Sequence, residues 1–228
     1  MVKALQTVRN LTGAGKVIFE LKLKLRVFFY FLPEVGKGEL SLGRFVLLLR
    51  RLLLFLSRMR HNKYVTIGGK TRMGLYIPGF PSGAFQTACR KFRQFEEKMP
   101  CTTVLVSVTS ACPYHCRHCY QKLDRGPDVD IQVLTEVVRK LQEMGIAFFN
   151  IEGGEPFYAY ERLRQICAVL DDRSEIWINS TGAGMTLERL RELKALGVTA
   201  VMFSLHSPEA KAFNDFLGKE IGRASCRE

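Results

Sequence analysis

Three cysteines follow a short apolar segment at close spacing. They are Cys112, Cys116 and Cys119, in a C-x3-C-x2-C arrangement, and residues 102–109 before them are apolar and rich in β-branched side chains, which predicts a strand. Three thiolates in the loop after a strand can bind three irons of a four-iron cluster and leave the fourth iron open. An open iron can bind a substrate or a cofactor.

The same loop also allows a zinc site. His115 and His118 lie among the cysteines, and either imidazole could be the fourth ligand of a tetrahedral zinc ion. The cysteine motif alone leaves both metals open. A zinc-stabilised Cys/His interaction module is therefore the alternative function.

A second motif lies one helix and one strand further along the chain. Residues 131–144 have a helical pattern, and residues 147–151 form another short apolar run that ends in Glu-Gly-Gly-Glu-Pro at residues 152–156. A strand, a cysteine loop, a helix and a strand followed by Gly-Gly-Glu-Pro resemble the radical S-adenosylmethionine (SAM) superfamily. This resemblance favours the iron cluster over zinc.

The resemblance implies a [4Fe-4S] cluster and SAM as cofactors. In the family the three cysteines hold the cluster, the fourth iron is chelated by SAM, and the Gly-Gly-Glu-Pro segment lines the methionine end. Glycines allow a backbone to approach a ligand, and Glu155 or exposed carbonyls could accept hydrogen bonds from an ammonium group. The implied metal ligands are Cys112, Cys116 and Cys119, and the implied methionine-binding residues are Gly153, Gly154, Glu155 and Pro156.

Helix and strand patterns continue to alternate after the second motif. Residues 162–170 and 187–196 have helical patterns, and residues 175–178 and 198–203 are strand candidates. This alternation predicts an α/β fold with a parallel sheet, in which polar residues gather at the carboxyl ends of the strands. By resemblance, the fold is a partial TIM-like barrel with about four of the six βα units of the family's core.

Polar residues at the ends of the third and fourth strands are candidate SAM contacts. By resemblance, Asn179, Ser180, Ser204 and His206 would lie near the ribose and carboxylate of SAM. Asn and Ser are also common in turns and at helix starts for local reasons, which is the alternative explanation. His118 occupies the position where family members often carry an aromatic residue near the adenine, and an imidazole departs from the usual Tyr or Phe.

The resemblance implies an enzyme whose chemistry is carried by its cofactors. Reduced ferredoxin or flavodoxin would donate one electron through the cluster to the sulfonium of SAM, and the bond to C5′ would break. The resulting 5′-deoxyadenosyl radical would abstract hydrogen from the substrate. No side chain is assigned a catalytic role, and the motifs leave the substrate open between a lipid and a peptide.

The cysteine content indicates a reducing compartment. The chain has seven cysteines and no recognisable signal peptide, so they do not form a secreted disulfide framework. Cys89, Cys101 and Cys167 lack partners at useful spacing, and we expect them to be reduced structural thiols. A cytoplasmic location follows, because an exposed low-potential cluster needs a reducing environment.

The positive charge is concentrated near the N-terminus. Of the net charge of +12, residues 1–60 contribute +9 through twelve Lys and Arg against three Glu. Two apolar runs, 17–32 and 45–56, lie in the same region, but they are too short or too charged to span a membrane. Basic and apolar residues together suggest an interfacial helix, and so contact with the inner membrane surface through residues 17–60. The alternative is a pair of helices packed on the catalytic domain.

Nucleic-acid binding is not expected, since the basic residues alternate with Leu and Phe instead of forming a polar face.

Between this arm and the barrel, residues 63–77 predict a hairpin that turns at Gly68 and Gly69, and residues 84–98 predict a helix. The expected organisation is an arm at 1–62, the hairpin, loop and lead-in helix at 63–100, and a partial radical SAM core at 101–219.

Residues 220–228 form the last expected segment. They back-translate to a sequence that resembles a common sequencing adapter, which predicts read-through instead of a natural tail. We expect a chain that stops here to lack the last two strands of the barrel and to be inactive. Its missing part would include contacts to the adenine of SAM.

Overall fold

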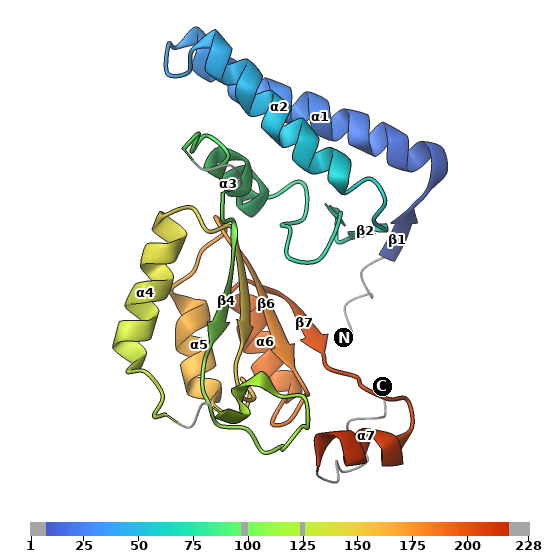
Figure 1. Ribbon diagram of the computed structural model, residues 1–228, viewed down its shortest axis with the longest axis vertical. Coiled ribbons are helices and arrows are strands. Elements are labelled where there is room, and N and C mark those ends of the chain that lie inside the picture. Colours follow the sequence, from blue (N-terminus) through green and yellow to red (C-terminus); the bar gives the residue numbers. More distant parts are fainter. Residues whose placement is uncertain (1–7, 97–99, 124–125, 219–228) are drawn as a thin grey trace. The chain divides into compact units, whose positions relative to one another are not determined.

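A computed structural model describes residues 8–96, 100–123 and 126–218 (Figure 1). The predicted read-through segment, 220–228, lies outside the described residues. The chain divides into two compact units. The first comprises Met1–Thr102 with Gly145–Ala147, and the second comprises Thr103–Met144 with Phe148–Glu228.

The first unit combines a small antiparallel sheet with three helices. Its strands are paired in the order β1-β2-β3. The elements are β1 (Val8–Leu11), α1 (Gly13–Gly36), α2 (Leu42–Arg58), β2 (Tyr64–Ile67), β3 (Lys70–Arg72) and α3 (Gly83–Lys91).

The predicted hairpin is confirmed, and a further strand joins it. β2 and β3 are connected through Gly68 and Gly69, whose φ angles of 56° and 79° lie in the left-handed region that such a tight turn requires. β1 pairs with β2, Val8 opposite Ile67. The first described element of the region expected to be a helical arm is therefore a strand. Its four residues are mostly exposed and carry no apolar alternation that would predict a strand.

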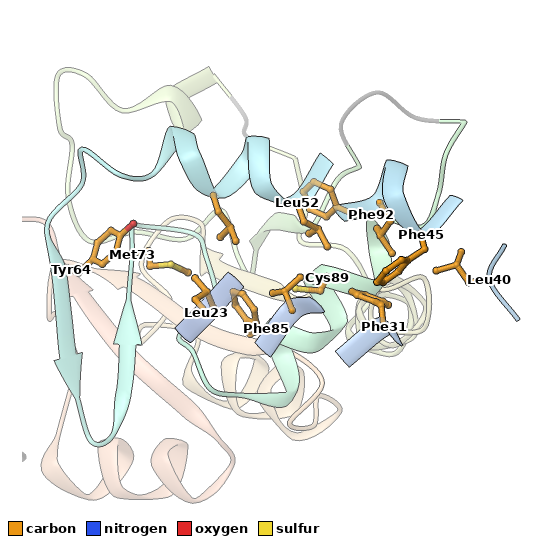
Figure 2. Packing of buried hydrophobic residues seen from close by; sticks show 13 residues of the cluster. Leu23, Phe31, Leu40, Phe45, Leu52, Tyr64, Met73, Phe85, Cys89 and Phe92 are labelled. Atoms are coloured by element: carbon orange, nitrogen blue, oxygen red, sulfur yellow. The ribbon is translucent and has the colours of Figure 1, made fainter. Parts of the chain in front are cut away.

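The helices α1 and α2 pack together through one face of each. These faces form a hydrophobic core with the hairpin and α3 (Figure 2). The two helices thus pack within the first unit, and packing on the catalytic domain, the alternative expected from the sequence, stays a prediction. Among the described residues, no helix is both long enough and apolar enough to cross a membrane. The core includes Leu23, Val27, Phe31, Phe45, Leu48, Leu52, Leu56, Tyr64, Met73, Phe85, Cys89 and Phe92.

The helix expected over residues 84–98 ends earlier, at Lys91. Tight turns follow it, and the guanidinium of Arg51 on α2 donates hydrogen bonds to the carbonyls of Phe92 at 2.9 Å and Gln94 at 3.0 Å. These carbonyls follow the helix end, where a cationic side chain is favourable. Arg51 therefore stabilises the backbone that follows the C-terminus of α3.

The second unit is a parallel sheet in which helices connect the strands. Its strands are β4 (Thr103–Ser107), β5 (Phe148–Glu152), β6 (Glu175–Ser180) and β7 (Val198–Phe203), hydrogen-bonded in this order. Parallel strands in sequence order are the arrangement of a partial TIM-like barrel, which confirms the predicted fold class. The helices are α4 (Ile131–Glu143), α5 (Tyr160–Ala168), α6 (Leu187–Ala195) and α7 (Ala210–Leu217).

The two faces of this sheet differ in character. Successive residues of a strand point to opposite faces, so Phe149 and Ile151 lie on one face of β5 while Asn150 and Glu152 lie on the other. The apolar face belongs to the core that α4, α5 and α6 complete with fully buried side chains. The second face presents polar groups at the carboxyl end, where Ser107 of β4 is paired with Glu152. The helix residues of the core include Val138, Leu163, Ile166, Cys167 and Leu193.

Candidate functional site

The three cysteines lie in the loop between β4 and a short 3₁₀ helix at Tyr120–Leu123, and each is half-buried. A backbone hydrogen bond from Cys119 N to Cys116 O, at 3.2 Å, forms a turn between the last two. Within the described part of the chain, no three Cys, His, Asp or Glu side chains are arranged to hold a metal ion. The structure thus brings the cysteines into one loop without directing the thiols at a common point.

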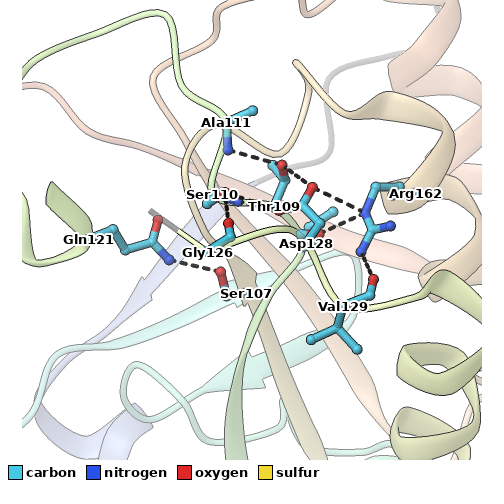
Figure 3. Close-up of polar contacts among 10 residues, drawn as sticks. Ser107, Thr109, Ser110, Ala111, Gln121, Gly126, Asp128, Val129 and Arg162 are labelled. Atoms are coloured by element: carbon cyan, nitrogen blue, oxygen red, sulfur yellow. Dashed lines mark hydrogen bonds and ion pairs between the residues drawn. The ribbon is translucent and has the colours of Figure 1, made fainter. Parts of the chain in front are cut away.

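An ion pair between Asp128 and Arg162 anchors the start of this loop (Figure 3). Asp128 accepts hydrogen bonds from Thr109 Oγ1 at 2.7 Å and Ser110 N at 2.8 Å. The guanidinium of Arg162, on α5, donates to Val108 O at 3.0 Å and lies 3.7 Å from the Asp128 carboxylate. Two charged residues therefore fix the backbone just before Cys112.

Asp128 is ionised in this setting. Burial acts to raise the pKa of its carboxyl group, but hydrogen bonds from Thr109 and Ser110 and the charge of Arg162 outweigh burial and lower the pKa below its ordinary value. Sequence reasoning missed both anchors. Asp128 stands in a Pro-Asp turn and Arg162 on an exposed-looking helix, so neither carries a local signal of its role.

The Gly-Gly-Glu-Pro segment lies directly against the cysteine loop. Gly154 N donates to Thr109 O at 2.7 Å, and Glu155 N donates to Ala111 O at 2.9 Å. A Cβ atom at Gly154 would lie 2.1 Å from Ala111 O, and one at Gly153 would lie 2.7 Å from Thr109 O. The glycines are therefore required by contact with the chain itself, whereas the sequence interpretation attributed them to the approach of a ligand.

Glu155 is an internal anchor. Its side chain is 1% exposed, and its two carboxylate oxygens accept hydrogen bonds from Ser180 Oγ at 2.7 Å, from Thr181 N at 2.8 Å and from Phe157 N at 3.2 Å. The Thr181 hydroxyl donates as well, at 2.5 Å. Glu155 thus ties the segment to the end of β6. Of the two acceptors expected for an ammonium group, exposed carbonyls fit this geometry better than Glu155, and the neighbouring Pro156 is buried.

Glu152 organises a polar cluster on the second face of the sheet. Tyr120 OH donates to Glu152 Oε1 at 2.6 Å, while Asn179 Nδ2 and Asn150 Nδ2 donate to Oε2 at 3.1 and 3.4 Å. The carboxylate thereby orients both amides, and their Oδ1 atoms are buried with no hydrogen-bond partner among the described residues. Buried acceptors of this kind need donors. Sequence reasoning included Asn179 but gave no role to Glu152, Asn150 or Tyr120.

The remaining candidates from the sequence lie at the same end of the sheet. Ser180 is buried, and its hydroxyl donates to Glu155 and accepts from Gly182 N at 2.8 Å. Ser204 is half-buried, and its backbone N donates to Ser180 O at 2.9 Å, which joins the ends of β6 and β7. Ser180 is therefore committed to internal bonds.

His118 belongs to an aromatic cluster that links the cysteine loop to α7. Its ring centre lies 4.5 Å from that of Phe216 and 4.9 Å from that of His206. Burial, with a smaller contribution from His118, lowers the pKa of His206. The loop backbone is held to α7 as well, since His115 N donates to Leu217 O at 3.0 Å.

The thiol of Cys112 has an environment that favours its protonated form. Burial raises its pKa, a backbone hydrogen bond from Tyr114 opposes this, and the nearby Glu155, Cys116 and Cys119 raise it further. A bound metal cation reverses this balance, because thiolates are the species that ligate metals. The donor set of three soft sulfur ligands in one loop fits an iron–sulfur cluster.

Known proteins match about half of this chain. It is 24% identical over 124 residues to a PqqA peptide cyclase of Streptomyces rochei, covering 53% of this chain and 34% of that protein. It is 30% identical over 121 residues to GTP 3′,8-cyclase 2 of Pseudomonas aeruginosa, covering 50% of this chain and 36% of that protein. The chain thus spans about a third of the length of these curated relatives.

A solved structure and a family model also match. The crystal structure of Streptococcus suis SuiB bound to precursor peptide SuiA covers 60% of this chain and 31% of that chain at 15% sequence identity, with a TM-score of 0.46. The model of the Radical SAM superfamily matches residues 106–227, more than half of the sequence. The chain therefore belongs to the radical SAM superfamily.

Proposed function

We propose that the chain carries the cluster- and methionine-binding part of an enzyme that cleaves SAM reductively to a 5′-deoxyadenosyl radical. The superfamily in general uses SAM, an iron–sulfur cluster and an electron donor. When bound, these cofactors supply the electron transfer and the radical that abstracts hydrogen from the substrate. The protein binds and orients them and excludes water.

One observation carries this proposal. The backbone of the cysteine loop contacts the backbone of the Gly-Gly-Glu-Pro segment, through Gly154 N to Thr109 O at 2.7 Å and Glu155 N to Ala111 O at 2.9 Å. Two motifs separated by a whole helix are thereby joined. A cluster held by the first motif and an amino acid moiety bound at the second would be neighbours, as reductive cleavage of SAM requires.

Each residue of the site has a proposed task. Cys112, Cys116 and Cys119 hold a [4Fe-4S] cluster, for which the loop must turn its thiols toward one point. Backbone groups of Gly153 and Gly154 bind the methionine end, and Glu155, Pro156 and Ser180 position that backbone.

Other residues are proposed to bind the ribose and the adenine of SAM. The buried Oδ1 atoms of Asn150 and Asn179 are acceptors for the hydroxyls of a ribose, and Ser204 lies at the adjacent strand end. His118 offers a ring for the adenine, extended by the neighbouring Phe216. Reduced ferredoxin or flavodoxin is the proposed electron donor.

A peptide is the proposed substrate class, in line with the names of two relatives. Two of the matching proteins are named PqqA peptide cyclase, at 24% and 25% identity. Other relatives are named GTP 3′,8-cyclase, at 28% and 30% identity. The proposed peptide substrate follows the names of the two PqqA peptide cyclases.

Anaerobic reconstitution with iron and sulfide tests the cluster. We expect a brown protein with roughly four irons per chain that loses its colour and iron in Cys116→Ala, because three thiolates hold this kind of cluster. The matched control is Cys101→Ala, which removes an exposed cysteine outside the loop. A colourless protein that binds one zinc would contradict the proposal and favour the zinc-stabilised module.

Cleavage of SAM is measured separately. Dithionite reduction of a reconstituted chain extended to the length of its relatives should release 5′-deoxyadenosine and methionine in equal amounts, and Cys116→Ala in that longer chain should release neither. Iron binding without any cleavage, in a chain extended by the rest of its gene, would contradict the proposed reaction while leaving the cluster intact.

A further inference from the structure

The outward face of α1 carries an exposed apolar row. Its members recur every three or four residues, so they lie on one side of the helix, opposite the buried Leu23, Val27 and Phe31. At a rise of 1.5 Å per residue the row is about 21 Å long. The side chains are Ile18, Leu21, Leu25, Phe29 and Leu32, with exposed fractions of 66%, 60%, 49%, 60% and 40%.

Basic side chains flank the row on both sides. At 100° per residue, Lys22 and Arg26 project beside one edge of the row and Lys24 beside the other, and all three are exposed. Long basic side chains of this kind lay their methylene stems along an apolar surface and extend their charges away from it. The exposed face of α1 therefore combines an apolar row with a positive border.

The acidic residues of α1 do not balance this charge, because both are engaged elsewhere. Glu20 interacts with the hydroxyl of the buried Tyr64, and burial together with the charge and hydrogen bonding of Glu20 raises the pKa of Tyr64 to about 12. Glu34 forms an ion pair with Arg93 at 3.0 Å. The outward face keeps its positive charge.

The neighbouring helix shows the same composition on its exposed side. Val46, Leu47 and Leu54 of α2 are 59%, 45% and 54% exposed, and Arg50 lies among them, exposed as well. An interfacial helix was expected at residues 45–56, but the side of α2 that carries Phe45, Leu48, Leu52 and Leu56 faces the core. The exposed side of α2 is a different surface of the helix.

We propose that the outward face of α1 binds the surface of an anionic lipid bilayer, with the apolar row from Ile18 to Leu32 inserted at the level of the headgroups. A helix with an apolar stripe and a basic border lies in the plane of such an interface. Charge distinguishes the bilayer from a second copy of the chain. A symmetric pair of α1 helices would bring Lys22 and Arg26 against the same residues of the partner.

A cavity beside the row has matching chemistry. It has a volume of about 320 Å³ and is lined mainly by apolar side chains, with Arg26 at its border. An acyl chain with an anionic headgroup fits this combination, since the apolar wall accepts the chain and the guanidinium the charge. The lining residues include Arg26, Val27, Phe29, Phe80, Pro81 and Phe85.

Sedimentation of the full chain with vesicles tests the proposal. The chain should sediment with vesicles of phosphatidylcholine and phosphatidylglycerol and much less with phosphatidylcholine alone, and salt should weaken the binding. Lys22→Gln/Arg26→Gln should weaken it roughly 30-fold, because each basic residue near such a surface contributes about a fivefold factor. The matched control, Arg191→Gln/Lys194→Gln on α6, should bind as the unchanged chain does.

The role of the apolar row is tested by comparing substitutions in the row with a substitution at an exposed apolar residue elsewhere. Leu25→Glu/Phe29→Glu should abolish sedimentation, whereas Val133→Glu on α4, which is 54% exposed, should not. Tryptophan at Phe29→Trp should be quenched by brominated lipid, and tryptophan at Val133→Trp should not. Equal binding to neutral and anionic vesicles, or equal quenching at both positions, would overturn the proposal. So would a dimer in solution that Leu25→Glu/Phe29→Glu dissociates, because a second copy would then cover the row.

Discussion

Tyr120 donates a hydrogen bond of 2.6 Å to Oε1 of Glu152, and so connects the residue after the third cysteine to the residue before Gly-Gly-Glu-Pro. The same carboxylate receives the amides of Asn150 and Asn179 through Oε2. One side chain thus relates the cysteine loop to the polar ends of β5 and β6. This arrangement places a negative charge in the proposed SAM site.

The Glu152 charge should be detectable through Tyr120. Burial first, and then the hydrogen bond and charge of Glu152, raise the pKa of the Tyr120 phenol. In Glu152→Gln the contribution of the carboxylate disappears, so we expect this pKa to fall toward the ordinary value. Nuclear magnetic resonance of labelled tyrosine during a pH titration measures it. Glu192→Gln is the control, because its partner is Tyr160 and Tyr120 should then be unaffected.

Gly154→Ala should disrupt the contact between the two motifs. The added Cβ would meet the backbone oxygen of Ala111, which cannot move without displacing the loop. We expect a loss of about 1–3 kcal/mol in the free energy of unfolding, together with loss of iron binding. The control is Gly43→Ala on α2, where nothing lies within 4 Å of the new atom. Chemical denaturation of both variants gives the comparison, and equal stabilities would refute the close contact.

Asp128→Asn should destabilise the protein at neutral pH and much less in acid. The pKa of Asp128 is lower in the folded state than its ordinary 3.8, so its stabilising effect is present above that value and is lost as the pH falls below it. We expect a cost of about 1–3 kcal/mol at pH 7, since charge-assisted hydrogen bonds to Thr109 and Ser110 are weakened. Urea unfolding at neutral and at acid pH measures the difference. A cost that is independent of pH would rule out this role of the charge.

Glu155→Gln should weaken the link between the Gly-Gly-Glu-Pro segment and β6. The amide nitrogen of Gln cannot accept a hydrogen bond, so at least one of the donors on Ser180 and Thr181 loses its acceptor, at a cost of about 1–3 kcal/mol. A double-mutant cycle with Ser180→Ala measures the coupling. If the two changes prove additive, the Glu155 to Ser180 bond does not contribute as described.

Sequence patterns predicted the second unit well. The alternation of apolar strands and amphipathic helices predicted the four strands and the helices α4, α5 and α6 to within a few residues, because both periodicities follow directly from which face is buried, whereas no range was predicted for α7. The hairpin turn at Gly68 and Gly69 was equally visible, since two residues with positive φ leave few choices. By contrast, β1 depends on pairing with a strand more than fifty residues away, which no local pattern records.

The sequence was sufficient to predict the two motifs of the candidate site, but not the residues that hold these motifs in place. Asp128 and Arg162 act through partners that lie far from them in the sequence, and short polar turns rarely announce such contacts. Glu155 illustrates the opposite error: a carboxylate in a ligand-binding motif invites a ligand role, yet its burial at 1% exposure and its internal bonds give it a structural one. Distinguishing the two required knowing which residues surround it.

The absence of room at Gly153 and Gly154 has a consequence for how such a protein can change. At Gly154 the two segments meet through main-chain atoms, so their separation there is set by bond lengths and van der Waals radii that every sequence shares. Substitutions elsewhere can reshape the surrounding walls, and thereby the choice of substrate, without altering that separation. The distance between the cysteine loop and the Gly-Gly-Glu-Pro segment can therefore stay constant while the rest of the sequence diverges.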